Sequence, residues 1–400
     1  MPRYQKIRFV TYDTVTANPT RLLPDGADNG YRTDAHIRAV TLTNVADWTR
    51  RKFTAADIPG HTLNVFVAPE FFFRYGGPSD PDEALRDSYP NGDATLPDLV
   101  DAVLRPRLAG QEWADWLFVP GTMFWHRPPC AEDPGPRYFN TVPVVRGGPR
   151  VDVTGRSRAI DRDPGRVPVM GGGSLNEKRL MSPIDYARCG VGSGSGVGFG
   201  VGSGVGSGVG FGVGSVRQDR LNEDLRLIPD DWEWWRRHVF SVQDVLRSDG
   251  TPLVFGVEVC LEHTVAEGDA GPGVLRTLCD ADLARDQGRP GEGGWTDEPP
   301  EIDVQVLTAC GRPLDQERGV AARVKGYVVR CDGTQPADEA DWPVTAADLD
   351  RVTAVAPDGR RRTRPVNGRQ DTELPLSLQL PVRARRRDKD HVTTWPALSI

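Results

Sequence analysis

The chain has 400 residues, of which 38% are hydrophobic and 26% charged, and its formal net charge is −7. That length accommodates one large or two ordinary domains, and the hydrophobic content is sufficient for a buried core. The acidic balance argues against nucleic acid as the main partner. The longest uncharged run, 189–216, is nearly half glycine and would insert poorly into a bilayer, so no membrane association is expected. Six cysteines are scattered without a Cys-x-x-Cys pair, which is typical of a reduced, cytoplasmic protein.

The first 155 residues alternate between strand-like and helix-like patterns. Short apolar runs predict buried strands at 6–12, 62–68 and 115–121. Apolar residues at helical spacing predict helices at 33–53 and 96–108. A hairpin is expected where 138–145 and 150–154 flank a turn at Arg146-Gly147-Gly148. This order indicates a layered α/β fold with a mixed sheet.

The middle of the chain contains a low-complexity segment. The stretch 176–185 is polar and ends at a Pro-bearing turn, and from 190 to 214 every even-numbered residue is glycine. An extended segment of this kind would place all its side chains on one face. The backbone entropy of glycine favours a flexible loop instead, so 190–215 is interpreted as a Gly-rich insert.

The second half resumes with predicted strands at 253–259, 302–309 and 324–330 and a helix near 274–285. Beyond about residue 334 the chain turns polar and contains two arginine clusters, at 360–364 and 383–389. Basic clusters can indicate nucleic-acid binding. No aromatic residues interleave with these arginines, which favours a solvated or partly disordered Arg-rich extension over 336–400.

Three segments each offer one reactive group: Glu70, which follows the strand at 62–68 and Pro69, Lys178 in the polar stretch, and Cys260, directly after the strand at 253–259. A thiol held at the end of a rigid strand suits nucleophilic chemistry, although a buried, inert core cysteine is the alternative. A carboxylate base would generate the thiolate, and an ammonium group would stabilise the charge that develops when the thiolate attacks.

The order and spacing of these motifs resemble the nitrilase superfamily of carbon–nitrogen hydrolases. The resemblance rests on Pro69-Glu70, on Lys178-Arg179-x-x-x-Pro183 and on Gly256-Val257-x-x-Cys260, and the CLEH at 260–263 is similar to the Cys-Trp-Glu-His of true nitrilases. It implies an α/β fold, a four-layer α-β-β-α sandwich that assembles as a homodimer or higher homo-oligomer. The single catalytic domain would span 4–335, carry the insert 190–215 and precede the extension 336–400. The implied roles are general base for Glu70, oxyanion stabiliser for Lys178 and nucleophile for Cys260.

Residues near this triad are candidate auxiliaries. Asp185 stands where the family often carries a second glutamate, although it also fits a surface aspartate that caps a turn. The Leu261 backbone N–H is a candidate second oxyanion donor. Glu262 flanks the nucleophile, and strand alternation predicts that Glu258 lies on the same face as Cys260, where it could touch the site, although a buried structural hydrogen bond is equally expected. His263 is either a Cys–His base or a structural histidine, and the presence of Glu70 favours the latter.

The sequence therefore predicts a thiol hydrolase, without a cofactor or a metal, that acts on a small-molecule amide or nitrile through a Cys260 acyl-enzyme. His126 and Cys130 lack partners at metal-ligand spacing. The aromatic runs at 71–73 and 232–235 suggest an apolar substrate end. Two alternatives stay open: an acyltransferase that uses the same thioester, and a non-catalytic scaffold that retains the fold.

Overall fold

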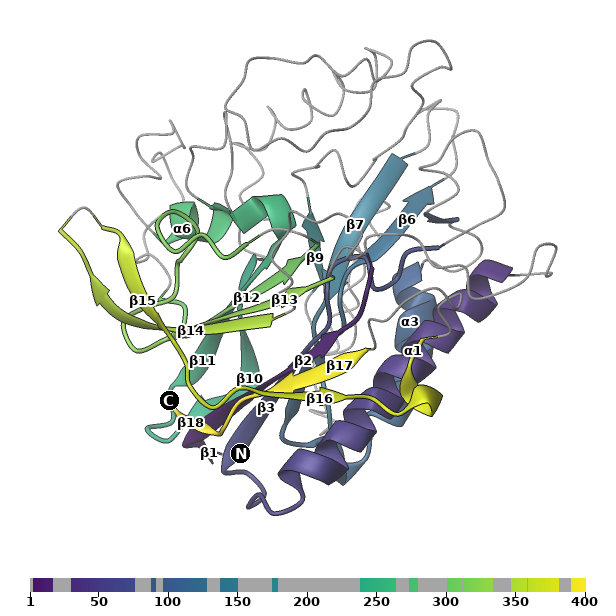
Figure 1. Cartoon of the computed structure of the whole chain (residues 1–400), viewed down its shortest axis with the longest axis horizontal. Helices are drawn as coiled ribbons and strands as arrows, with labels where there is room; N and C mark the ends of the chain where they lie inside the picture. The colour runs from purple at the N-terminus through teal and green to yellow at the C-terminus, as the bar shows by residue number, and fades with distance from the viewer. Residues whose placement is uncertain are drawn as a thin grey trace, which may run out of the picture.

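The computed structural model describes part of the chain, and it shows a mixed α/β protein with several sheets (Figure 1). None of the helices in this part is both long and apolar enough to cross a membrane. The described residues are 3–16, 30–75, 88–90, 96–127, 137–149, 175–178, 238–263, 273–279, 301–310, 313–333, 347–357, 359–380 and 390–400.

The first sheet has seven strands, of which the central β11, β12 and β13 run parallel. Strand β10 joins β11 antiparallel, and β14 joins β13 antiparallel. In spatial order the strands are β1 (Arg3–Tyr4), β10 (Val239–Arg247), β11 (Pro252–Val259), β12 (Val304–Ala309), β13 (Tyr327–Asp332), β14 (Ala347–Val355) and β15 (Arg361–Pro365).

The second sheet also has seven strands and is built around the parallel strands β2, β3 and β5. Strands β17 and β18 both pair with the other edge of β2. In spatial order the strands are β16 (Gln370–Glu373), β17 (His391–Thr394), β2 (Lys6–Asp13), β3 (Thr62–Val67), β5 (Trp116–Val119) and β8 (Val145–Arg146), with β18 (Leu398–Ser399) beside β2.

A third, smaller sheet adjoins the second through a bridge between Phe73 and Met123. Its order is β4 (Tyr89–Pro90), β6 (Met123–Arg127), β7 (Arg137–Pro143) and β9 (Leu175–Lys178). Strand β7 pairs with β6 and β9, so the predicted hairpin between 138–145 and 150–154 is not the pairing that this strand makes. The second arm of that hairpin lies outside the described residues.

The two large sheets pack face to face around a buried core. Alternate side chains of β2, β3 and β5 meet those of β11, β12 and β13, and the rings of Phe9 and Tyr327 lie 5.6 Å apart across the interface. Because both central trios are parallel and buried on both faces, their sequences are nearly continuous apolar runs. This property explains why the sequence reveals these strands so clearly.

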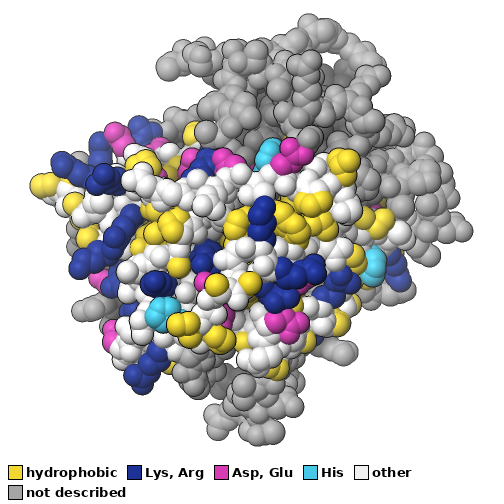
Figure 2. Space-filling model, turned by 60° about the horizontal axis from the view of Figure 1, so that its bottom comes forward, with side chains coloured by type: hydrophobic (Ala, Val, Ile, Leu, Met, Phe, Trp, Pro, Cys, Tyr) yellow, Lys and Arg dark blue, Asp and Glu magenta, His cyan; other side chains and the backbone are white. Residues whose placement is uncertain are grey.

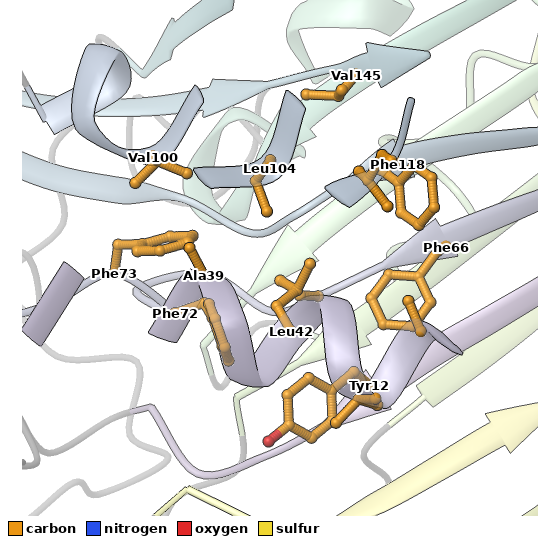
Figure 3. Packing of buried hydrophobic residues seen from close by; sticks show 14 of the residues in the cluster. Tyr12, Ala39, Leu42, Phe66, Phe72, Phe73, Val100, Leu104, Phe118 and Val145 are labelled. Atoms are coloured by element: carbon orange, nitrogen blue, oxygen red, sulfur yellow. The ribbon is translucent and has the colours of Figure 1, made fainter. Parts of the chain in front are cut away.

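Helices α1 (Gly30–Thr49) and α3 (Leu96–Arg107) cover the other face of the second sheet (Figures 1 and 3). Leu42 of α1 and Leu104 of α3 pack against the outward-facing aromatic rings of Phe66 and Phe118. On the outer side of the first sheet, α6 (Val274–Leu278) contacts β11. Helices therefore lie on both sides of the paired sheets.

A buried arginine of α1, which forms an ion pair within that helix, ties α1 to the turn that follows β3. Arg38 Nε donates to Asp34 Oδ1 over 2.7 Å, and Arg38 Nη1 donates to the Phe72 carbonyl over 2.9 Å. Both charged side chains are almost fully buried. A buried pair of this kind contributes geometric definition more than stability. It holds the Phe72 backbone, two residues beyond Glu70, at a fixed place on the helix.

The interpretation of 336–400 as a solvated tail is wrong for the residues that the structure describes there. Strands β14 and β15 extend the first sheet, and β16, β17 and β18 build onto the second. The short β17 buries Val392, Thr393 and Thr394, which are β-branched residues that suit a strand but do not form a long apolar run. Three of the four arginines of 360–364, namely Arg361, Arg362 and Arg364, lie in the edge strand β15, where charge discourages pairing with other chains.

The distribution of basic side chains on one face of the molecule bears on whether the protein has a nucleic-acid-binding surface. In Figure 2, Lys and Arg side chains lie among hydrophobic and uncharged ones and do not merge into a single stripe. A continuous basic stripe is the footprint expected of a nucleic-acid-binding surface. The cluster at 383–389 and the Gly-rich run 190–215 lie outside the described residues.

Asp13, at the end of β2, provides a test of this packing. Burial raises the pKa of its carboxyl to about 6, against the lowering effect of hydrogen bonds with Thr393 and Thr11. The folded protein therefore binds this proton more tightly than the unfolded chain does. The contribution of Asp13 to the free energy of unfolding should fall by about 3 kcal/mol as the pH rises from about 4 to about 6.

Urea unfolding of the wild type and of Asp13→Asn across pH 4–7 measures this contribution as a difference. The asparagine does not titrate, so the difference should change over that pH window and level off above it. Asp371→Asn removes the other carboxylate that Thr393 contacts and should leave the fall in place. Parallel stability curves for the wild type and Asp13→Asn would contradict the expectation.

Candidate active site

Glu70 lies just beyond the carboxyl end of β3, with its side chain fully buried. Its N–H donates to the Ala309 carbonyl over 3.3 Å, and its own carbonyl accepts from Thr16 Oγ1 over 2.6 Å. The next residue, Phe71, has a positive φ of 59°, and its N–H donates to Thr122 Oγ1 over 2.7 Å. The peptide around Glu70 is therefore fixed on both sides, in a conformation that L-residues rarely adopt.

Cys260 lies at the carboxyl end of β11, where the short 3₁₀ helix η4 (Cys260–His263) begins. Its φ is 49°, in the left-handed region, and its side chain is 4% exposed. Backbone strain of this kind gathers at functional sites, where the surrounding structure holds it in place. The thiol belongs to the same buried cluster between the two sheets as Val257 and Val259.

A third buried residue, Cys310, links Glu70 and Cys260 electrostatically. Burial raises the pKa of the Cys310 thiol well above its usual value, the proximity of Glu70, Asp332 and Cys260 raises it further, and Arg74 lowers it. Glu70 and Cys260 therefore lie within electrostatic reach of one thiol, although they follow strands of different sheets. Cys310 Sγ donates to the Gly333 carbonyl over 3.3 Å, and this thiol stays protonated near neutrality.

Lys178 is placed by its backbone in β9. Its partner in the β7–β9 register is Asn140, and Asn140 Nδ2 donates to Glu70 Oε1 over 3.1 Å. Strand β9 also contacts β11, which ends at Cys260. The segments that carry Glu70, Lys178 and Cys260 therefore converge on one region.

The prediction that Glu258 shares a face with Cys260 is wrong. Glu258 lies on the opposite side of β11, where Oε1 accepts from the Leu275 N–H of α6 and Oε2 accepts from Gln305 Nε2, each over 2.8 Å. Alternation fails at Cys260 because a residue with positive φ does not continue the extended geometry of the strand. Glu258 is a buried structural hub behind the site.

Both ring nitrogens of His263 are engaged within the protein. The Asp315 N–H donates to Nε2 over 3.1 Å, so the proton lies on Nδ1, which contacts Glu258 Oε2 over 2.8 Å. A Cβ atom on Gly319 would lie 2.3 Å from the ring. This arrangement favours the structural interpretation of His263 over a Cys–His base.

The remaining predicted auxiliaries fall into three situations. Glu262 is fully buried, and its Oε2 accepts from the Val259 N–H over 3.0 Å and lies 3.4 Å from His238 Nε2, so it stabilises the turn that carries Cys260. Leu261 is placed by its backbone, inside that turn and directly after the thiol. Asp185 lies outside the described residues.

Sequence reasoning missed three buried residues of this region. Cys310 follows β12 just as Cys260 follows β11, so the strand-end argument applies equally to it. Asn140 is a lone amide in an apolar run. Arg74 is 5% exposed, and its guanidinium lies 4.9 Å from the centre of the Phe71 ring. The ring of Phe124 stands edge-on to Phe71 at 6.0 Å, which adds an aromatic wall to the region.

Within the part of the chain that the structure describes, no three His, Cys, Asp or Glu side chains are grouped so that they could hold a metal ion. Comparison of the sequence with models of protein families found no match, and comparison with curated proteins found none either. The assignment of the site therefore depends on its geometry and its chemistry.

The structural role of Glu258 predicts a loss of stability on Glu258→Gln. The variant replaces one of two acceptor oxygens with an N–H₂ group that faces other donors. The free energy of unfolding should fall by about 2–3 kcal/mol in denaturant titrations. Glu317→Gln, at an exposed residue 3.4 Å from Arg360, should change it by less than about 0.5 kcal/mol. Equal losses in the free energy of unfolding for the two variants would contradict the structural role of Glu258.

Proposed function

We propose that the protein is a thiol hydrolase of the nitrilase superfamily that cleaves a non-peptide carbon–nitrogen bond through an acyl-enzyme on Cys260. The observation that carries the proposal is that the segments bearing the three residues lie together: the Glu70 N–H donates to the carbonyl of Ala309 at the end of β12, β12 pairs with the β11 strand that precedes Cys260, and β9, which carries Lys178, contacts β11. The helices outside both sheets support a four-layer α-β-β-α sandwich as the fold. A homodimer or higher homo-oligomer stays a prediction.

The first half-reaction forms the thioester. Glu70 takes the proton of Cys260 Sγ, and the thiolate attacks the carbonyl carbon of an amide. Negative charge then develops on the carbonyl oxygen, where the Lys178 ammonium and the Leu261 N–H stabilise it. The protonated Glu70 passes its proton to the nitrogen, the carbon–nitrogen bond breaks, and ammonia or an amine departs.

The second half-reaction restores the enzyme. Glu70 removes a proton from water, which attacks the thioester carbon, and the same oxyanion donors stabilise the second tetrahedral intermediate. Collapse of that intermediate breaks the carbon–sulfur bond, releases a carboxylic acid and returns the proton to Cys260. One carboxylate thus serves both steps, which fits a side chain that is buried and held by Asn140.

The surroundings support a substrate with an apolar acyl portion. Phe71 directly follows Glu70, is buried, and packs against Phe124. Apolar walls with a few placed polar groups are typical of small-molecule sites. We therefore place aryl and medium-chain aliphatic amides first in a substrate panel, followed by the corresponding nitriles.

Ammonia release from that panel tests the proposal, with Cys260→Ala and Cys310→Ser as a matched pair. Both residues are buried thiols that follow neighbouring parallel strands. Cys260→Ala should lower ammonia release at least about 1,000-fold because it removes the nucleophile. Cys310→Ser keeps the hydrogen-bond donor to the Gly333 carbonyl and should retain activity within about tenfold.

Intact-mass measurement during turnover should find an acyl adduct on the wild type and none on Cys260→Ala. Unchanged ammonia release by Cys260→Ala would exclude a Cys260 acyl-enzyme. Absence of both ammonia and adduct across the panel would count against the hydrolase and favour the scaffold alternative.

A further inference from the structure

Within the described part of the chain, only the Nδ2 end of the Asn140 amide is hydrogen-bonded. The side chain is fully buried on β7, and its Nδ2 donates to Glu70 Oε1 over 3.1 Å. Its Oδ1 is equally buried and accepts no hydrogen bond from any residue that the structure describes. The orientation of the amide is fixed because a carboxylate only accepts, so Nδ2 must face Glu70 and Oδ1 must face away from it.

A second buried amide shows the usual arrangement. Gln305 Nε2 donates to Glu258 Oε2 and to the Gly319 carbonyl, and its Oε1 accepts from the Ala321 N–H, all over 2.8 Å. Buried amides normally satisfy both ends in this way because an unmet acceptor costs free energy of folding. Among the described residues, Asn140 Oδ1 has no donor, and it belongs to the side chain that holds the proposed general base Glu70.

We propose that Asn140 binds the nitrogen of a primary carboxamide: Oδ1 accepts a substrate N–H while Nδ2 holds Glu70. This inference rests on the proposed function and selects among its substrate classes. In the proposed mechanism Glu70 passes its proton to that same nitrogen. Asn140 is hydrogen-bonded to Glu70, so its Oδ1 is an acceptor close to the group that must approach the substrate nitrogen. Backbone pairing also sets Asn140 opposite Lys178, between the base and the proposed oxyanion stabiliser.

The number of N–H groups on the substrate nitrogen distinguishes an amide from a nitrile as the substrate class. A primary amide presents two N–H groups, one for Oδ1 and one for the Glu70 carboxylate. A nitrile nitrogen carries no hydrogen and leaves Oδ1 unmet. As the amide nitrogen gains a proton and leaves, its N–H groups become stronger donors, so the contact strengthens toward the transition state. Asn140 thereby favours amides over nitriles with the same carbon skeleton.

The experiment measures kcat/KM of the full chain for phenylacetamide, methyl phenylacetate and phenylacetonitrile. The amide and the ester give the same thioester, but the ester has no N–H on its leaving group. Asn140→Leu should lower kcat/KM for the amide at least tenfold more than for the ester, because only the amide loses a hydrogen bond. Asn140→Asp keeps an acceptor and should retain most of the amide-to-ester ratio, even where its absolute rates fall.

Gln305→Leu is the matched control, because its amide is satisfied entirely within the protein. It should leave the amide-to-ester ratio of kcat/KM within threefold of wild type, whatever it does to stability. Equal losses for amide and ester in Asn140→Leu would overturn the inference and leave Asn140 as a residue that only positions Glu70. No loss for either, or a wild type that prefers the nitrile, would overturn it as well.

The rate of alkylation of Cys260, which does not require turnover, tests the role of Asn140 separately from the proposed hydrolase activity. The rates at which iodoacetamide and iodoacetonitrile alkylate Cys260 are compared by peptide mass spectrometry, each relative to glutathione. The wild type should favour iodoacetamide, and Asn140→Leu should lose at least tenfold of that preference. An unchanged preference overturns the role of Asn140. Alkylation of Cys260 no faster than of Cys310 counts against the hydrolase itself.

Discussion

One backbone hydrogen bond joins the two sheets at the site: the Glu70 N–H donates to the carbonyl of Ala309, the last residue of β12. The same carbonyl accepts from the Gly333 N–H over 2.8 Å, so the ends of β3, β12 and β13 meet at one oxygen. A Cβ atom on Gly333 would lie 1.7 Å from Thr16 Oγ1, the donor to the Glu70 carbonyl. Glycine at this position therefore allows the β2 and β13 ends to close around Glu70.

The two faces of β11 carry different groups. The face toward the second sheet is the front of the site, and the face toward α6 is the back. In front, Glu70, Cys260 and Cys310 follow the carboxyl ends of β3, β11 and β12, and Asn140 donates a hydrogen bond to Glu70. Behind β11, Glu258 collects donors from α6, from β12 and from His263. Buried carboxylates that are fully satisfied fix geometry instead of reacting. The back thus holds the end of β11 rigid, while the strained turn at Cys260 presents the thiol to the front.

The sequence reveals those parts of the molecule whose signals are local. Apolar runs predict the strands that precede Glu70 and Cys260. Alternation fails to place Glu258 because the conformation of Cys260 depends on tertiary contacts. The strands beyond 346 stay hidden because their partners are remote: Tyr12 Oη donates to Asp390, 378 residues away. Asp185 and the aromatic run at 232–235 lie outside the described residues and stay predictions.

The place of β2 in the second sheet has a consequence for biosynthesis. This strand pairs with β3 on one edge and with β17 and β18 on the other, so it leaves the ribosome long before half of its partners exist. At about 5–20 residues per second, the 378 residues between Tyr12 and Asp390 take roughly 20–80 s to translate. Throughout that time one edge of β2 is open to incorrect pairing. The second sheet is therefore completed only after residues 391–399 have been synthesised.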